Sequence, residues 1–94
     1  MLFRSLNTNV ETLNNNFDLS VFPNPAQDEV NVRTENAEIL MIELFSVNGQ
    51  KIANIENLQT NNYQLDLNKL MQGAYYLRVT TNKGVQTKSL ILSK

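Results

Sequence analysis

The feature that most constrains the fold of this chain is the alternation of apolar and polar residues in short runs. Tyr63, Leu65 and Leu67, for example, are separated by single polar residues. Successive side chains of a strand point to opposite faces of a sheet, so this period of two is typical of half-buried β-strands. Turn residues separate seven such runs, at residues 17–22, 28–33, 39–46, 50–56, 61–67, 73–80 and 85–93. With no helical stripe anywhere, the pattern predicts an all-β fold, a seven-stranded antiparallel immunoglobulin-like β-sandwich.

The patterned region has a clear beginning. Residues 1–16 are polar, rich in asparagine and show neither period. We therefore expect a flexible linker or tail over residues 1–16 and one folded domain over residues 17–94.

Two turns predict hairpins between neighbouring strands. Asn48-Gly49 favours a two-residue type I′ turn, because both residues tolerate the positive φ that this turn requires. Asn82-Lys83-Gly84 marks a second hairpin. The first turn would pair Leu44 with Ala53, Ile42 with Ile55, and Phe45 with Ile52.

The only two prolines of the chain lie together, in Phe22-Pro23-Asn24-Pro25-Ala26. Proline lacks a ladder N–H and holds the preceding residue extended, so strand pairing must stop here. We interpret the segment as a rigid corner that sends the chain from one sheet to the other. The functional alternative is an exposed, preformed motif for a receptor.

A second cluster precedes the sixth expected strand. Leu70 would close the end of the sandwich, and Gly73 would provide the tight turn into the strand. Tyr75 would face inward, where its hydroxyl needs a partner. This arrangement is typical of the tyrosine corner of sandwich folds, in which the hydroxyl bonds to upstream backbone.

The composition excludes several kinds of chemistry. Cysteine and histidine are absent, which removes thiol nucleophiles, disulfides, the usual zinc sites and imidazole catalysis. The carboxylates form no calcium-loop pattern, and the three glycines form no phosphate-binding loop. A formal net charge of −1 gives no electrostatic case for nucleic acid. We expect no enzymatic activity, no small-molecule substrate, no metal and no cofactor.

Charge is distributed unevenly along the chain. Residues 1–66 hold nine acidic and three basic residues, whereas residues 67–94 hold five basic residues and no acid. Strands from both halves should interleave in a sandwich, so we expect these charges to mix in space. The alternative is a basic end presented to an acidic partner.

Several of these segments resemble one known family. Phe22-Pro23-Asn24-Pro25-Ala26, with Asp28 and Val30-Asn31-Val32 after it, resembles the YPNPA opening of type A C-terminal sorting domains of the type IX (Por) secretion system. Residues 42–52 resemble the hairpin of that family, residues 70–79 its "L..GiYlvrv" segment, and residues 88–92 its "kkliv" ending. Phe22 replaces the usual tyrosine, and Ala74 replaces a larger aliphatic residue. The resemblance covers about residues 17–94.

The resemblance implies a function that the composition does not. Such domains follow cargo domains in secreted proteins of Bacteroidetes, and any signal peptide would lie upstream. The sorting domain directs passage from the periplasm across the outer membrane, through a translocon. A sortase-like peptidase then removes it, and the cargo reaches the cell surface or the medium. Cleavage would fall within residues 1–16, and we expect the domain to be a monomer.

A folded surface would be the signal that the translocon reads. We expect the last strand to be a free edge, open to strand addition by a partner. The rival hypothesis is an adhesion or carbohydrate-binding accessory module, for which Tyr76 is the candidate contact. The candidate recognition and family-motif residues are Pro23, Asn24, Pro25, Asn48, Gly49, Gly73, Tyr75, Lys88, Leu90, Ile91, Leu92 and Lys94.

Overall fold

A computed structural model describes residues 17–94, which contain seven β-strands and no helix. Each strand lies where the alternation predicts it, and no boundary differs by more than two residues. The strands are β2 (Asp18–Phe22), β3 (Glu29–Glu35), β4 (Ile39–Ser46), β5 (Lys51–Ile55), β6 (Asn62–Asp66), β7 (Gly73–Thr81) and β8 (Gly84–Leu92). The tail and processing region expected over residues 1–16 lie outside the described residues.

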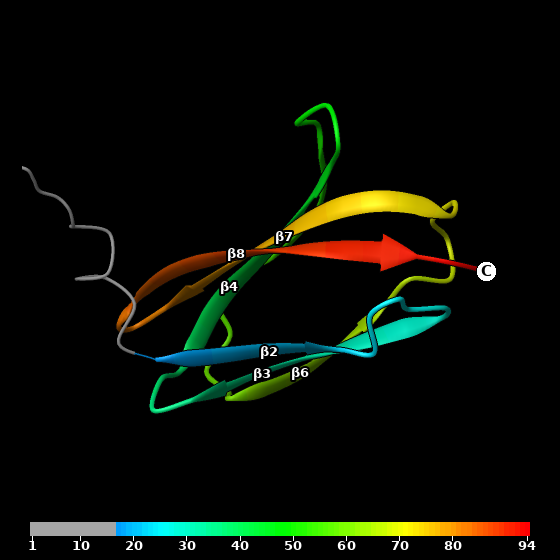
Figure 1. Cartoon of the computed structure of the whole chain (residues 1–94). Coiled ribbons are helices and arrows are strands. Elements are labelled where there is room, and N and C mark those ends of the chain that lie inside the picture. The colour runs from blue at the N-terminus through cyan, green and yellow to red at the C-terminus, as the bar shows by residue number, and fades with distance from the viewer. Residues whose placement is uncertain (1–16) are drawn as a thin grey trace, which may run out of the picture.

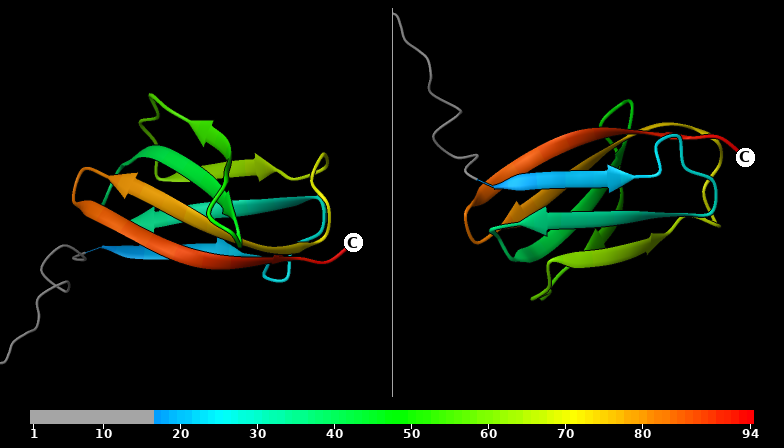
Figure 2. Two further views of the ribbon diagram at one scale, coloured as in Figure 1. Left: turned by 90° about the horizontal axis from the view of Figure 1, so that it is seen from above. Right: turned by 60° about the horizontal axis from the view of Figure 1, so that its bottom comes forward.

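The strands form two antiparallel sheets that lie face to face (Figure 1). One sheet has the order β2-β3-β6 and the other the order β5-β4-β7-β8. The predicted seven-stranded antiparallel sandwich is therefore confirmed. In a constant-type immunoglobulin domain the fourth strand joins the first, second and fifth. Here the fourth strand, β5, pairs instead with β4 in the other sheet, as the two further views in Figure 2 show.

The core lies between the two sheets and consists of the apolar half of each alternating run. On β7, for example, Leu77 and Val79 are fully buried, whereas their neighbours Tyr76 and Arg78 point outward. Burial of this apolar area is the main force that holds the two sheets together. The buried apolar residues are Phe17, Leu19, Ala26, Val30, Val32, Ile39, Ile42, Leu44, Leu65, Leu67, Leu77, Val79, Leu90 and Leu92.

The β4–β5 turn differs from the predicted type I′ turn. The N–H of Gly49 donates to Ser46 O at 3.0 Å, and the N–H of Ser46 donates to Gln50 O at 2.9 Å. Gly49 has φ of +89°, whereas Asn48 is not among the residues with positive φ. This is a three-residue loop in which only glycine occupies the left-handed region.

The longer loop shifts the register near the turn. Phe45 pairs with Lys51, so its predicted pairing with Ile52 is wrong. A register shift between Leu44 and Phe45 then absorbs the extra residue. Beyond it the predicted pairs Leu44–Ala53 and Ile42–Ile55 are confirmed. The Asn82-Lys83 hairpin is also confirmed, since β7 and β8 pair up to Thr81–Gly84.

The proline segment does not lead from one sheet to the other. β2 and β3, the strands on either side of it, are neighbours in the same sheet. Both Phe22-Pro23 and Asn24-Pro25 are cis peptide bonds. The segment interrupts pairing, as expected, but the prediction of a corner between sheets is wrong. It loops out toward β8 of the opposite sheet before it returns (Figure 1).

The two sheets differ in charge, although acids and bases from the two halves of the sequence also meet, as Glu43 and Arg78 do. The strands of the three-stranded sheet carry four carboxylates and one arginine. Those of the four-stranded sheet carry one carboxylate and three basic residues. Strands from both halves of the sequence do interleave. However, β6 adds Asp66 to the sheet that is already acidic, and β5 adds Lys51 to the sheet that is already basic.

Among residues 17–94 no helix could serve as a membrane span.

The core predicts a sharp contrast between two positions of the four-stranded sheet. Leu77 is fully buried on β7, whereas Val85 on β8 is 45% exposed. Leu77→Ala should lower the free energy of unfolding by about 2–5 kcal/mol, because it leaves a cavity. Val85→Ala should cost less than about 1 kcal/mol. Urea denaturation measures both, and similar losses would contradict this description of the core.

Candidate functional site

Two segments far apart in the sequence meet at one end of the sandwich. Asn24, from the proline segment, lies against the outer edge of β8. Its side-chain Nδ2 donates to Ser89 O at 3.0 Å, and the N–H of Ile91 donates to its Oδ1 at 3.0 Å. The amide thus offers β8 one donor and one acceptor, as a peptide group of a neighbouring strand would.

Ala26 continues this contact with its backbone. It forms a parallel bridge with Leu92, in which its N–H donates to Ile91 O and its carbonyl accepts from the N–H of Ser93, both at 2.8 Å. Ala26 has no exposed surface, which explains why a small side chain stands at this close contact. We call the contact of Asn24 and Ala26 with residues 89–93 the clasp.

The clasp overturns the prediction that the last strand ends in a free edge. Over residues 89–93 the outward backbone groups of β8 that a partner strand would need are engaged by Asn24 and Ala26. The reason is the detour of the proline segment, which lies alongside the strand instead of crossing between sheets. A strand could be added at this point only after the clasp had opened.

Lys94 ties the chain to the β6–β7 loop just beyond the clasp. Its Nζ donates to the carbonyl oxygens of Leu67, Asn68 and Leu70, at 3.1, 3.1 and 2.6 Å. An ammonium group has three N–H donors, so each of them has a carbonyl partner here. The side chain holds residues 67–70 in one conformation next to the start of β7.

Tyr75 fixes the other side of that loop. Its hydroxyl donates to Met71 O at 2.5 Å, so the expected tyrosine corner is confirmed. Leu70 packs against the core, as predicted. Gly73 has φ of +153°, which a residue with a side chain adopts only with strain, and it pairs with Leu92.

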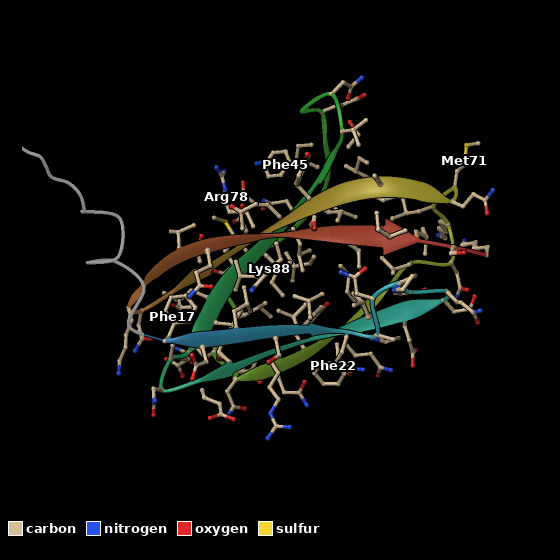
Figure 3. The ribbon with its side chains drawn as sticks, viewed as in Figure 1. Phe17, Phe22, Phe45, Met71, Arg78 and Lys88 are labelled. Atoms are coloured by element: carbon tan, nitrogen blue, oxygen red, sulfur yellow. The ribbon has the colours of Figure 1, made fainter. Side chains whose placement is uncertain are left out.

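Most of the predicted site residues therefore lie together. Asn48 and Gly49 are the exception at the tip of the β4–β5 hairpin, which projects away from the sandwich (Figure 1). Lys88 directly precedes the clasp residues of β8, and its side chain points toward the three-stranded sheet (Figure 3). The residues at the clasp end are Pro23, Asn24, Pro25, Gly73, Tyr75, Leu90, Ile91, Leu92 and Lys94.

Lys88 is an inward-facing charge on an edge strand. Its register partner on β7 is Leu77, which is buried, so both belong to the inner face of the sheet. It remains exposed and borders an open groove of about 450 Å³, together with Asp18 and Glu35 of the opposite sheet.

One charged cluster escaped the sequence analysis. The carboxylate of Glu43, 4% exposed, contacts Arg78 Nε at 2.8 Å and Lys51 Nζ at 2.9 Å on the outer face of the four-stranded sheet. These hydrogen bonds, that of Arg78 first, lower the pKa of the Glu43 carboxyl from 4.5 to about 2, against the opposing effect of burial. Pairing β4 with β7 in register would have revealed it, because Glu43 and Arg78 are direct partners.

The clasp end holds its backbone segments together through polar side chains. Its polar groups are amides, a hydroxyl and an ammonium that already have partners. Pro23 and Pro25 border an open depression of about 520 Å³ with Asp28 and Glu29. Within residues 17–94 no three acidic residues gather as metal ligands would.

Together these features define a small immunoglobulin-like sandwich whose last strand is fastened at its outer edge. A family model described as a secretion system C-terminal sorting domain matches residues 20–93. The chain therefore belongs to the C-terminal sorting domains of the type IX secretion system. Such a domain is a sorting signal within a cargo chain and implies export toward the outer membrane and cell surface. No curated protein matches the sequence.

The clasp predicts a specific effect of its asparagine. Asn24→Ala removes two hydrogen bonds and leaves the N–H of Ile91 without its partner, so the free energy of unfolding should fall by about 1–3 kcal/mol. Amide hydrogen exchange at Ile91 should accelerate more than at Leu77. Asn31→Ala is the control, because its side-chain contact is longer, at 3.5 Å. Unchanged exchange at Ile91 in Asn24→Ala would rule out the clasp.

The Glu43 cluster predicts how stability depends on pH. The folded pKa lies below the unfolded value, so this carboxylate contributes stability above about pH 4.5 and loses it as pH falls toward 2. The difference in unfolding free energy between the native chain and Glu43→Gln should thus be largest near neutral pH and shrink toward pH 2. Urea denaturation at pH 7, 4, 3 and 2 measures it; a constant difference would exclude the ion pairs as its source.

Proposed function

We propose that residues 17–94 are read as a folded unit by the outer-membrane translocon of the type IX system, and that the clasp end is the part that is read. One observation carries this proposal. The proline segment and the terminal strand, both family motifs, are separated by more than 60 residues yet form a single site. A signal built from both segments exists only when the domain is folded.

The exposed surface of the clasp end supports the same reading. The amide of Asn24 is engaged with β8, so its role is to hold the site together. The adjacent Pro23 and Pro25 are exposed, and so is Ile91 of the fastened strand. Exposed, conformationally fixed side chains suit a recognition surface, because little entropy is lost when a partner binds them.

Removal of the domain from its cargo is the second part of the proposal. A sortase-like peptidase would cut within residues 1–16, upstream of β2. Phe17 and residue 94 lie at opposite ends of the sandwich (Figures 1 and 3). The translocon and the peptidase would then act at separate ends, so both could bind the domain at the same time.

A carbohydrate-binding or adhesion module is the second candidate function. Tyr76 is 45% exposed, and its register partner Phe45 lies beside it on β4. Aromatic rings on an exposed sheet face are a common platform for sugars. This function would require saturable binding to a glycan in the absence of any secretion machinery.

Export of a reporter tests the proposal. A signal peptide, a reporter enzyme and residues 1–94 are fused and expressed in a Bacteroidetes host with an active type IX system. We expect the reporter outside the outer membrane and shortened by the loss of the sorting domain. A reporter that stays in the periplasm would contradict the proposed function, and an exported but uncut one would contradict the cleavage.

Truncation tests the part played by the terminal strand. Deletion of residues 90–94 should abolish export, but it also removes two buried leucines. Lys94→Met is therefore compared with Lys83→Gln in the β7–β8 turn, with folding checked by circular dichroism. Export that falls in the folded Lys94→Met variant and not in Lys83→Gln supports the proposal. Export that persists after the deletion would refute a role for the strand.

A further inference from the structure

The outer face of the four-stranded sheet is unusually apolar. Of the seven large apolar side chains described as exposed, six belong to this sheet or to the loops that lead into it. Figure 3 shows Phe45, Arg78 and Met71 on this side of the sheet, away from the three-stranded sheet. The six are Val47, Ile52, Met71, Tyr76, Val85 and Ile91.

The register gathers these side chains into adjacent rows. Phe45 pairs with Tyr76, and Ala74 pairs with Ile91 in the next row on the same face. Tyr76 and Ile91 are thus diagonal neighbours on paired strands, a spacing that aromatic side chains can span. Together they form a continuous apolar strip from β4 to β8, which ends at the strand that the clasp holds.

The outer face of the three-stranded sheet is the internal comparison. Its outward positions carry Ser20, Arg33, Asn31, Gln64 and Asp66 among others. Phe22 is the one large apolar side chain described as exposed there. An exposed apolar strip on one face and a polar opposite face distinguish an interaction surface from incidental exposure.

The charge of the apolar face favours an acidic partner. Glu43 is the one carboxylate in its four strands, and it is 4% exposed beneath its two cationic neighbours. Arg78 and Lys51 are 46% and 47% exposed, so these strands present two exposed cations and no accessible carboxylate. Directly after β5, the exposed Glu56 accepts a hydrogen bond from Asn54 Nδ2, so one carboxylate borders the face at its β5 edge. The guanidinium of Arg78 also lies over the ring of Phe45, 5.1 Å from its centroid.

We infer that this face docks onto a protein surface with an apolar centre bordered by carboxylates. The inference rests on the proposed function, so the partner belongs to the outer-membrane part of the secretion machinery. The aliphatic side chains of Ile52, Val85 and Ile91 offer nothing to sugar hydroxyls, which disfavours a glycan. Two exposed cations are too few for firm attachment to anionic lipid, where each contributes about 1 kcal/mol.

The first test removes the apolar strip. Tyr76→Ser combined with Ile91→Ser is introduced into the reporter fusion, and Gln64→Ser on the outer face of the three-stranded sheet is the control. Circular dichroism and thermal unfolding confirm that each variant is folded. Export of the double variant should fall at least about tenfold, as expected when interface anchors are truncated, and that of Gln64→Ser should stay within about twofold.

The second test probes the sign of the charge on the partner surface. Thr87 is exposed and pairs with Arg78 on the apolar face. Thr87→Glu should reduce export because it opposes an acidic partner, whereas Thr87→Lys should not. Equal export of both variants would overturn the charge argument.

The identity of the partner class needs a direct readout. A photo-crosslinking amino acid at position 76 should form a protein adduct in the secreting host, and the same group at position 64 should not. Binding of the purified chain to phosphatidylglycerol vesicles, or to a glycan array, would overturn the inference. If the native domain fails to export the reporter, the proposed function fails. If it succeeds and the Tyr76/Ile91 variant is exported equally well, only the docking face fails.

Discussion

The arrangement of this domain depends on how the outer edge of its last strand is satisfied. A strand at the edge of a sheet exposes backbone groups that seek partners. Here an asparagine side chain and an alanine backbone supply those partners over residues 89–93. The same contact connects the two sheets at one end and sets Ile91 in position. Beside it, Lys94 and Tyr75 hold the β6–β7 loop, so contacts from three segments meet at this end of the sandwich.

Much of this fold can be predicted from the sequence, because burial of one face imposes a period of two on every strand. Tyr63, Leu65 and Leu67 indicate β6 without any structure, and Gly73 with Tyr75 indicates the tyrosine corner. Local chemistry decides these features, so a local pattern reveals them. The β4–β5 turn marks the limit: Asn48-Gly49 suits a two-residue loop, but the backbone closes one residue earlier and a bulge restores the pairing.

The candidate site could be predicted only in part, since its contacts join distant positions. Asn24 meets Ser89 and Ile91 across more than 60 residues, and no periodicity encodes which edge an exposed asparagine will reach. The prolines show where pairing stops but not where the chain then goes. Glu43 and Arg78 lie opposite each other on the paired strands β4 and β7, so their ion pair can be predicted only once the strand order is known.

Lys88 carries a consequence for the behaviour of many copies at once. Its ammonium sits on the inner side of an edge strand, where a second sheet laid alongside would have to bury it without water. The charge of Lys88 therefore disfavours strand addition along the part of the β8 edge that the clasp leaves uncovered. A continuous sheet shared between neighbouring copies of the domain is therefore less readily built through this edge.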